Sequence, residues 1–329
     1  MRQTFIGQRN LFGESSANTS GIWGLRDILT MRLNDYLFNP SDTAGTGLFG
    51  AGQTVSGPLV NVIDYITIAT LGNAIDFGDL YSAYHLGAAA SATRAVWAGE
   101  WSAGNRIDYV TISSTGNSTD FGDLTLARGF LEGCGSSTRG LFGGGYYSSS
   151  YTNVIDYITF ASEGNAIDFG DLTTRRYNVD ALSSSIRGVF AGGSEEPIGG
   201  NPAAQTNTID YVTIASLGNA VDFGDRLATG SGGGTGMSSQ TRGVYLSGTN
   251  SLEYITIAST GNAIDFGDTL STNFTMACSS KIRGILSGTS YTNTIEYITI
   301  AVLGNSVDFG DLTVGRNTGA ACSSNHGGI

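Results

Sequence analysis

The sequence repeats one acidic motif, Asp-Phe-Gly-Asp, and a third acid precedes every copy in the run Ile-Asp-Tyr or a close variant of it. These acids account for 18 of the 28 Asp and Glu residues, as six repeats of three. Clustered carboxylates could bind calcium, because hard cations prefer several oxygen ligands. Their spacing matches neither an EF-hand loop nor a tight acidic nonapeptide repeat. We therefore predict no metal and no cofactor, with a repeated calcium site as the alternative. The copies begin at Asp76, Asp120, Asp168, Asp222, Asp265 and Asp308.

Other catalytic chemistry finds little support in the sequence. Asp-Phe-Gly is also the metal-binding triplet of protein kinases, but a kinase uses it once, with a glycine-rich ATP loop and a catalytic loop. The only histidines are His85 and His326, and we expect His326 near a surface C-terminus. No Ser-His-Asp set or paired-carboxylate cleft can be assigned. We expect a protein that is not an enzyme.

The three cysteines follow the repeat. Cys134 and Cys278 each lie five residues before an arginine, and Cys322 has the same register. Leu182 and Met237 occupy that position in other copies. A position that accepts Leu, Met and Cys indicates apolar packing rather than a disulfide or a metal ligand.

The elements that carry these residues are strands. Successive motifs are 44, 48, 54, 43 and 43 residues apart, a period typical of propeller blades. Each repeat predicts four strands, for example at residues 273–280, 139–144, 63–68 and 74–79. β-Branched and aromatic residues alternate in them, with turn residues between the runs. A tight turn centred on Gly-Asn is predicted between the third and fourth strands, because both residue types tolerate positive φ.

The two ends of the repeat region indicate a closed ring. Residues 317–324 read as a first strand with no second strand after it, whereas residues 47–52 read as a second strand with no first. The C-terminal strand can therefore complete the first blade, which protects the sheet edges. We predict an all-β fold with a single six-bladed β-propeller at residues 45–329 and an N-terminal extension at residues 1–44.

At the level of single positions the repeat resembles the kelch type of propeller. The shared features are the Gly-Gly after the second strand, as at Gly144 and Gly145, the aromatic residues in the third and fourth strands, as at Tyr65 and Phe77, and an arginine soon after, as at Arg128. The chain differs in lacking the fourth-strand Trp and in its doubled acid around Phe-Gly. Some kelch-like propellers are copper oxidases, but two histidines are too few to indicate such a site.

The near-identical copies also resemble repeat-bearing structural proteins of bacteriophages, particularly marine and cyanobacterial phages. The motif that carries this likeness is Ile-Asp-Tyr-Ile-Thr-Ile-Ala-Ser-x-Gly-Asn-Ala-Ile-Asp-Phe-Gly-Asp-Leu. Its copies extend the resemblance over about residues 45–324. The resemblance implies a virion protein of the tail, baseplate or fibre, synthesised in the host cytoplasm. The alternatives are a capsid decoration protein and, more distantly, a glycan-binding lectin outside a virion.

Composition limits the partners. The net charge of −12 and the single lysine leave little basic surface, so nucleic acid is not an expected partner. No run of about 20 apolar residues indicates a membrane span. Most of the acids belong to the repeat, and we expect them to pair with arginines or to cap turn amides between blades. Asp168 and Arg187 represent this scaffold, and we expect replacement of either to lower the melting temperature.

The links between the second and third strands differ from copy to copy, whereas the Gly-Asn turns do not. One link contains three tyrosines, another contains Trp101, and a third expands to residues 194–202. In a four-stranded meander these links leave from the same rim as the fourth-to-first links, so one rim is variable and the other uniform. Tyr, Ser and Gly on a rigid scaffold favour recognition of a partner, for example a cell-surface glycan, another virion subunit or a second copy. The candidate binding residues are Trp101, Tyr146, Tyr147, Tyr151 and Tyr291.

Residues 1–44 lie outside the repeat. Apolar residues at helical spacing from Ile22 onward, with Ser20 as a possible N-cap and Pro40 beyond the end, predict a helix. A Gly-Ile-Trp-x-Leu segment of this kind resembles those that flank repeat or fibre regions in phage tail proteins. The resemblance implies an anchor on another virion subunit. The candidate anchor residues are Ile22, Trp23, Leu25, Ile28, Leu29 and Leu33.

Overall fold

A computed structural model describes residues 4–10, 18–24, 45–81, 84–101, 104–196, 204–229 and 233–329 of the chain. The chain divides into two compact units, residues 1–43 and residues 44–329. Each unit is described by itself. In the described residues all regular structure is β-strand.

In the first unit, β1 (Thr4–Asn10) pairs antiparallel with β2 (Asn18–Gly24). The helix predicted from residue 21 onward is therefore wrong over residues 21–24, because Ile22 and Trp23 lie in β2 opposite Ile6 and Phe5. A β-branched and an aromatic residue between two glycines suit a paired strand better than a helix, since glycine is a poor helix former. The remaining anchor candidates, Leu25, Ile28, Leu29 and Leu33, lie outside the described residues.

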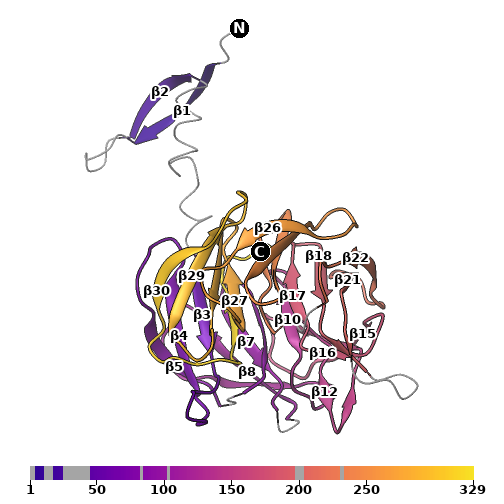
Figure 1. Ribbon diagram of the computed structural model, residues 1–329. Coiled ribbons are helices and arrows are strands. Elements are labelled where there is room, and N and C mark those ends of the chain that lie inside the picture. The colour runs from indigo at the N-terminus through magenta and orange to yellow at the C-terminus, as the bar shows by residue number, and fades with distance from the viewer. Residues whose placement is uncertain are drawn as a thin grey trace. The chain divides into compact units, whose positions relative to one another are not determined.

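The second unit consists mainly of six four-stranded antiparallel sheets, an arrangement consistent with propeller blades, and each sheet is called a blade below (Figure 1). Blade 1 contains β31 (Ala320–Ser323), β3 (Thr46–Gly50), β4 (Val62–Thr67) and β5 (Ile75–Asp79). Blade 2 contains β6 (Gly87–Ala90), β7 (Arg94–Ala98), β8 (Arg106–Thr111) and β9 (Thr119–Asp123). Blade 3 contains β10 (Glu132–Gly135), β11 (Arg139–Gly143), β14 (Val154–Thr159) and β15 (Ile167–Asp171).

The last three blades repeat the same order. Blade 4 contains β17 (Asp180–Ser183), β18 (Arg187–Ala191), β21 (Thr208–Thr213) and β22 (Val221–Asp225). Blade 5 contains β23 (Met237–Ser238), β24 (Arg242–Ser247), β25 (Ser251–Thr256) and β26 (Ile264–Asp268). Blade 6 contains β27 (Met276–Ser279), β28 (Arg283–Ser287), β29 (Thr294–Thr299) and β30 (Val307–Asp311).

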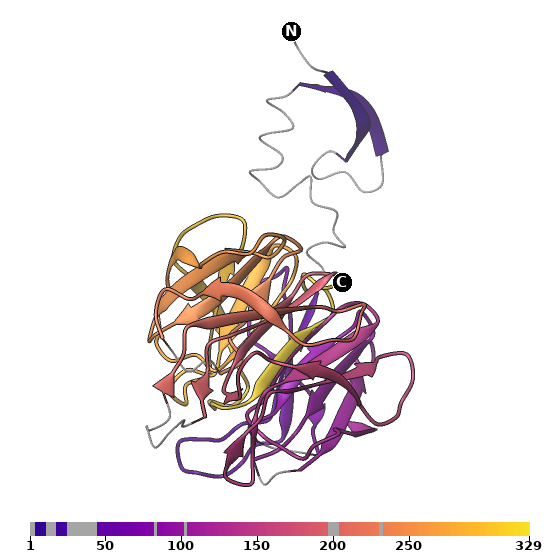
Figure 2. The same ribbon diagram turned by 90° about the vertical axis from the view of Figure 1, so that its right-hand side faces the viewer.

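The predicted closure by the C-terminal strand is confirmed. β31 pairs antiparallel with β3, with Cys322 opposite Leu48, and Figure 2 shows this yellow strand among the strands of the first blades. The first strands of the blades contact one another in sequence, and β31 contacts both β27 and β6. No edge is left open between the last blade and the first.

Hydrophobic side chains fill the spaces between blades. The third strand is buried on both faces: Ile63 packs with Trp97 between blades 1 and 2, whereas Ile66 packs with Ile285 between blades 6 and 1. Each of the six core clusters lies between two neighbouring blades. Full burial of one such side chain contributes about 1.5–3 kcal/mol, so each blade is stabilised by packing against its neighbours. Cys134, Cys278 and Cys322 lie buried in these clusters, which confirms their packing role.

The third-strand acids hold the blade boundaries. Asp156 in blade 3 lies 2.8 Å from Arg128, which comes from the link after blade 2, and both side chains are fully buried. The pairs Asp210–Arg176 and Asp64–Arg316 repeat this geometry at 2.8 Å. Glu296 instead accepts hydrogen bonds from the backbone N–H groups of Leu270 and Ser271. The predicted use of acids as scaffold is confirmed for this position.

Asp168 and Arg187, the two representative positions, differ from the buried third-strand acids and their arginines. Asp168, in the fourth strand, is exposed, and no described residue donates a hydrogen bond to its carboxylate. Arg187 forms no ion pair with an acid in the described part of the chain. Its guanidinium lies over the Tyr211 ring, 4.4 Å from the centroid, and donates to the Ile257 carbonyl of the next blade at 2.8 Å. Of the three repeated acids, the third-strand acid is the one that is buried at the blade boundary in every blade.

The Gly-Asn pair is a clasp between blades rather than a two-residue turn. In blade 3 the turn closes earlier, where the Ser162 N–H donates to the Thr159 carbonyl at 3.2 Å. Gly164 then donates to the Phe121 carbonyl of blade 2 at 2.8 Å, and Asn165 Oδ1 accepts from the Asp123 N–H at 3.1 Å. The same asparagine contact recurs at all six boundaries.

This clasp explains the glycine of Asp-Phe-Gly-Asp. Gly170 has φ of 146°, and a Cβ there would lie 2.5 Å from the Gly218 carbonyl of the next blade. The motif is therefore a docking edge for the neighbouring Gly-Asn segment, because only glycine allows the two backbones this close approach.

Candidate binding rim and axial channel

The second-to-third links and the fourth-to-first links lie on one rim, as predicted. In blade 3 the second-to-third link forms a hairpin of β12 (Tyr146–Tyr147) and β13 (Ser150–Tyr151). In blade 4 that link supplies β19 (Ser194–Glu195) and β20 (Ala204–Gln205), and β19 pairs with β16 (Arg176–Tyr177) of the fourth-to-first link. β12 and β16 lie at the lower rim in Figure 1.

The β12–β13 hairpin turns through Ser148 and Ser149, whose φ angles are 46° and 70°. Two successive left-handed residues are typical of the tightest hairpin turn, which usually takes Asn-Gly. Serine adopts this conformation at a cost, because its Cβ crowds the backbone there. The turn places Tyr146 beside Tyr151, with ring centroids 5.8 Å apart.

Seven aromatic rings of blades 2, 3 and 4 meet on this rim and are called the rim cluster below. Phe130 is its centre, with ring centroids 3.7 Å from His85, 4.8 Å from Trp101 and 5.5 Å from Tyr177. Tyr177 continues the cluster to Tyr151 at 4.6 Å. The members are Tyr84, His85, Trp101, Phe130, Tyr146, Tyr151 and Tyr177.

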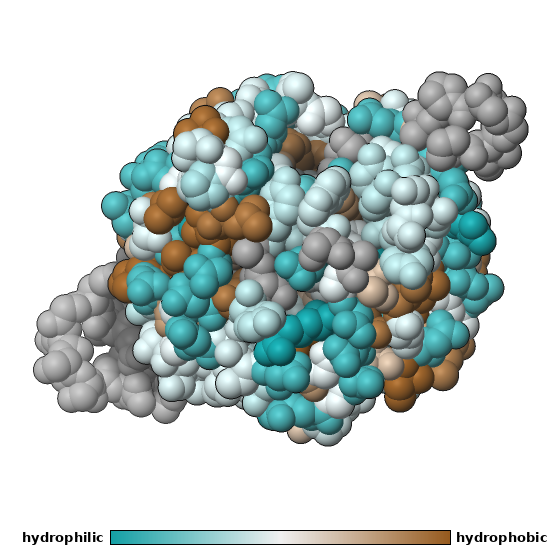
Figure 3. Space-filling view, turned by 90° about the horizontal axis from the view of Figure 1, so that it is seen from below, coloured by the Kyte–Doolittle hydropathy of each residue, from teal (hydrophilic) through white to brown (hydrophobic). Residues whose placement is uncertain are grey.

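The rim cluster is half-exposed. Trp101 is 55% exposed and the other six rings are intermediate in burial. Figure 3 views the molecule from this side and shows apolar patches separated by pale and hydrophilic surface. Burial raises the pKa of the Tyr84 and Tyr151 hydroxyls and lowers the pKa of His85 to about 3, so these three rings are neutral at neutral pH.

The structure brings together three of the five predicted binding residues, Trp101, Tyr146 and Tyr151. Tyr147 is 40% exposed and lines a neighbouring hollow of about 220 Å³ with Tyr151 and Arg175. Tyr291 is 38% exposed, and after burial it also contributes to the raised pKa of the Tyr84 hydroxyl.

Sequence reasoning missed Tyr84, His85, Phe130 and Tyr177. All four lie in the fourth-to-first links, whereas the predicted binding residues come from differences among the second-to-third links. Aligning each blade from its first strand backward would have placed His85 and Phe130 at one position, four residues before Ala89 and Cys134.

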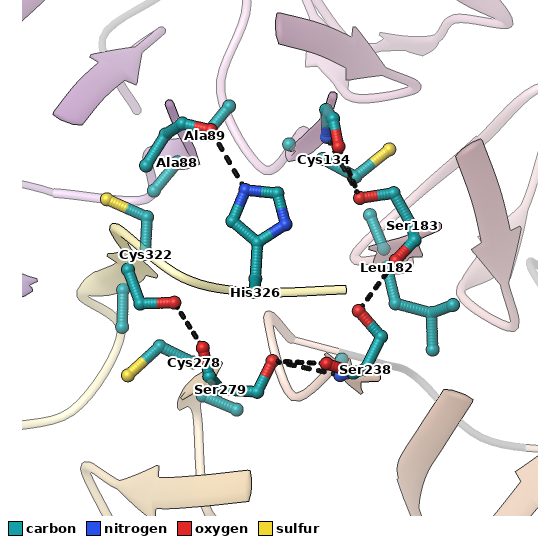
Figure 4. A pocket seen from close by; sticks show the side chains of 18 residues that line it. Ala88, Ala89, Cys134, Leu182, Ser183, Ser238, Cys278, Ser279, Cys322 and His326 are labelled. Carbon is teal, nitrogen blue, oxygen red and sulfur yellow. Dashed lines mark hydrogen bonds between the residues drawn. The ribbon is translucent and has the colours of Figure 1, made fainter. Parts of the chain in front are cut away.

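The axial channel is closed at the opposite end by the segment 325–329 (Figure 4). Serine hydroxyls at the ends of first strands donate to the carbonyl of the preceding blade, as from Ser183 to Gly135 at 2.6 Å and from Ser238 to Ser183 at 2.8 Å. Blade 3 has Gly135 at this position and no hydroxyl to offer the Ala90 carbonyl of blade 2. His326 Nε2 takes that place at 2.9 Å, while its Nδ1 accepts from the Gly328 N–H.

His326 is thus part of the channel packing, and the expectation of a surface position is wrong. Because the Ala90 carbonyl can only accept, Nε2 carries the proton and the ring is neutral. Burial lowers the pKa of His326, in agreement with this tautomer. The remaining space in the channel, about 40 Å³, is too small for a ligand larger than one or two water molecules.

The described part of the chain contains no group of three or more His, Cys, Asp and Glu residues able to hold a metal ion. Nor does it contain a helix long and apolar enough for a membrane crossing. No protein-family model and no curated protein sequence matches the chain.

Proposed function

We propose that this chain is a binding protein whose six blades form one kelch-like β-propeller, and that its ligand docks on the rim cluster. The observation that carries the proposal is the contrast between the rims. Seven rings gather on the rim whose links vary, whereas the opposite rim repeats one backbone clasp six times.

Half-exposed aromatic rings on a rigid scaffold are typical of recognition surfaces. Tyrosine and tryptophan give large contact area with few rotatable bonds, and such residues dominate the free energy of binding at interfaces. The flat, neutral rings and the tyrosine hydroxyls suit the apolar face and the hydroxyls of a sugar. We therefore propose a cell-surface glycan as the ligand class.

The likeness of the repeat to phage virion proteins supports a location for this activity. We propose that the chain is a component of a virion tail, baseplate or fibre, which presents the propeller to the host surface. The N-terminal unit would then attach the propeller to another virion subunit. Particles assembled with a chain lacking residues 1–44 should lose the protein, and its retention would contradict the attachment.

Glycan-array and host-cell binding by the full chain tests the ligand. The double variant Trp101→Ala with Tyr146→Ala should lose binding by about tenfold to a hundredfold, the usual loss for central aromatic contacts. Leu217→Ala is the matched control, because Leu217 is exposed to the same degree, 56%, in the clasp region. Unchanged binding by the double variant would remove the rim cluster as the site.

A further inference from the structure

A second cavity of about 240 Å³ lies on the axis at the variable-rim end, with lining residues from all six blades. It is called the axial-mouth cavity below. Its volume corresponds to roughly eight water molecules at 30 Å³ each. The polar and aromatic lining includes His85, Phe130, Glu132, Asn178, Thr275 and Thr318.

The wall of this cavity is strained and rigid. His85, Phe130, Asn178 and Thr318 occupy the same position in four blades, and all have φ between 54° and 56°. Backbone hydrogen bonds link them in series, from Asn178 N–H to the Phe130 carbonyl and from Phe130 N–H to the His85 carbonyl, both at 3.0 Å. Left-handed residues other than glycine cost about 1 kcal/mol or more each, and such strain gathers at ligand sites.

Glu132 is an acid at the cavity wall for which the described residues supply no positively charged partner. Glu132 is only 7% exposed. Oε1 accepts from the Gly133 and Ala88 N–H groups at 2.9 and 3.4 Å, whereas no described residue donates to Oε2. Asp180 holds the same strand position in blade 4, and there Arg226 lies 2.9 Å away. Of these two equivalent buried acids, Asp180 is paired with a cation, whereas no described residue supplies one to Glu132.

We propose that the axial-mouth cavity binds a small primary amine, with its ammonium group on the Glu132 carboxylate and its stem against the Phe130 and His85 rings. An ammonium group has three donors, which Glu132, Thr318 and Asn178 can accept. The rings add a favourable surface for an organic cation. A metal ion fits less well, because calcium requires six or more oxygens and the cavity offers one carboxylate.

The site also predicts a pH dependence. Burial, and then the nearby charge of Asp180, raises the pKa of Glu132 to about 8. Cys134 and Cys322 also lie close enough to interact with it, and both stay protonated because burial raises the pKa of each thiol. His85, whose pKa is about 3, stays neutral. An ammonium group binds the ionised carboxylate, so affinity should rise by about tenfold for each pH unit up to about pH 8.

Titration of the full chain with ethanolamine tests this proposal, with ethylene glycol as the uncharged probe of similar size. Calorimetry or NMR should show saturable ethanolamine binding that strengthens from about pH 6 to about pH 8, with release of a proton below pH 8. Ethylene glycol should bind more weakly and without this pH dependence. Absence of saturable ethanolamine binding, or equal binding of both probes, would overturn the proposal.

Glu132→Gln is the decisive variant, because the amide keeps an acceptor for Gly133 and Ala88 but cannot ionise. It should lose ethanolamine binding by tenfold or more at about pH 8 while remaining folded. Leu217→Ala, in the clasp region and outside this cavity, should bind ethanolamine as the unmodified chain does. Retention of binding by Glu132→Gln would contradict the site, and neither result depends on whether the rim cluster binds a glycan.

Discussion

The two rims of the six-bladed unit differ in what the same repeat does there. At the uniform rim every blade inserts a Gly-Asn segment against the fourth strand of its neighbour, and even the glycine of Asp-Phe-Gly-Asp serves that contact. At the variable rim the buried Arg–Asp pairs fix where the links start, and the links beyond them differ in length and aromatic content. The repetition that dominates the sequence therefore describes how blades join, whereas the candidate binding residues lie where the repetition ends.

The largest expected loss of stability comes from breaking a buried pair at the root of a variable link. Asp156→Asn leaves the Arg128 guanidinium buried without its charged partner and should lower the free energy of unfolding by about 3–5 kcal/mol. Asp168→Asn is the matched control in the exposed fourth-strand position and should change it by less than about 0.5 kcal/mol. Chemical denaturation of both variants measures the difference, and equal losses would mean that the acids are not divided into buried and exposed roles.

A smaller loss is expected from the uniform rim. Gly170→Ala introduces a Cβ 2.5 Å from the Gly218 carbonyl and should cost about 3 kcal/mol. Gly164→Ala has nearly the same φ, 148°, but nothing within 4 Å of the added atom, so it should cost about 1 kcal/mol of backbone strain alone. The gap between their melting temperatures isolates the clasp. Identical melting temperatures would mean that glycine is needed there only for its φ angle and not for the close approach of the two blades.

Glu132 should give the variable side a pH dependence that the clasp lacks. The folded state holds this proton until about pH 8, whereas the unfolded chain releases it near the ordinary value of 4.5. Folded stability from this group is therefore full at low pH and declines as the pH rises between those two values, by about 5 kcal/mol in all. Glu132→Gln should remove the decline, so its melting temperature should exceed that of the unmodified chain at about pH 9 and match it at about pH 4. If the difference in melting temperature between Glu132→Gln and the unmodified chain is the same at every pH, the raised pKa assigned to Glu132 is wrong.

Much of this fold is predictable from the sequence because the blades are nearly identical. Period, alternation and the unmatched first strand in residues 317–324 were sufficient for four-stranded sheets with closure through β31. The role of the Gly-Asn pair was not predictable, because a contact between blades and a hairpin turn favour the same residue types. For residues 21–24 helical spacing was misleading, since the partner strand β1 lies elsewhere in the chain.

The candidate site was predictable only in part for a related reason. Trp101, Tyr146 and Tyr151 stand out in links of unusual composition. Phe130 and His85 are single residues in short links, and their importance comes from stacking at 3.7 Å across a blade boundary. Glu132 gains its role because no described residue gives it the arginine that Asp180 has in the next blade. His326 gains its role because Gly135 has no hydroxyl for the Ala90 carbonyl.

The most direct test of the division between the rims is one variant measured in two assays. Trp101→Ala removes a half-exposed ring and should leave the free energy of unfolding within about 0.5 kcal/mol, while glycan or host-cell binding falls by at least about tenfold. Leu217→Ala should leave both quantities unchanged. If Trp101→Ala lowers stability and binding together, or changes neither, the variable rim is not a binding surface carried by an independent scaffold.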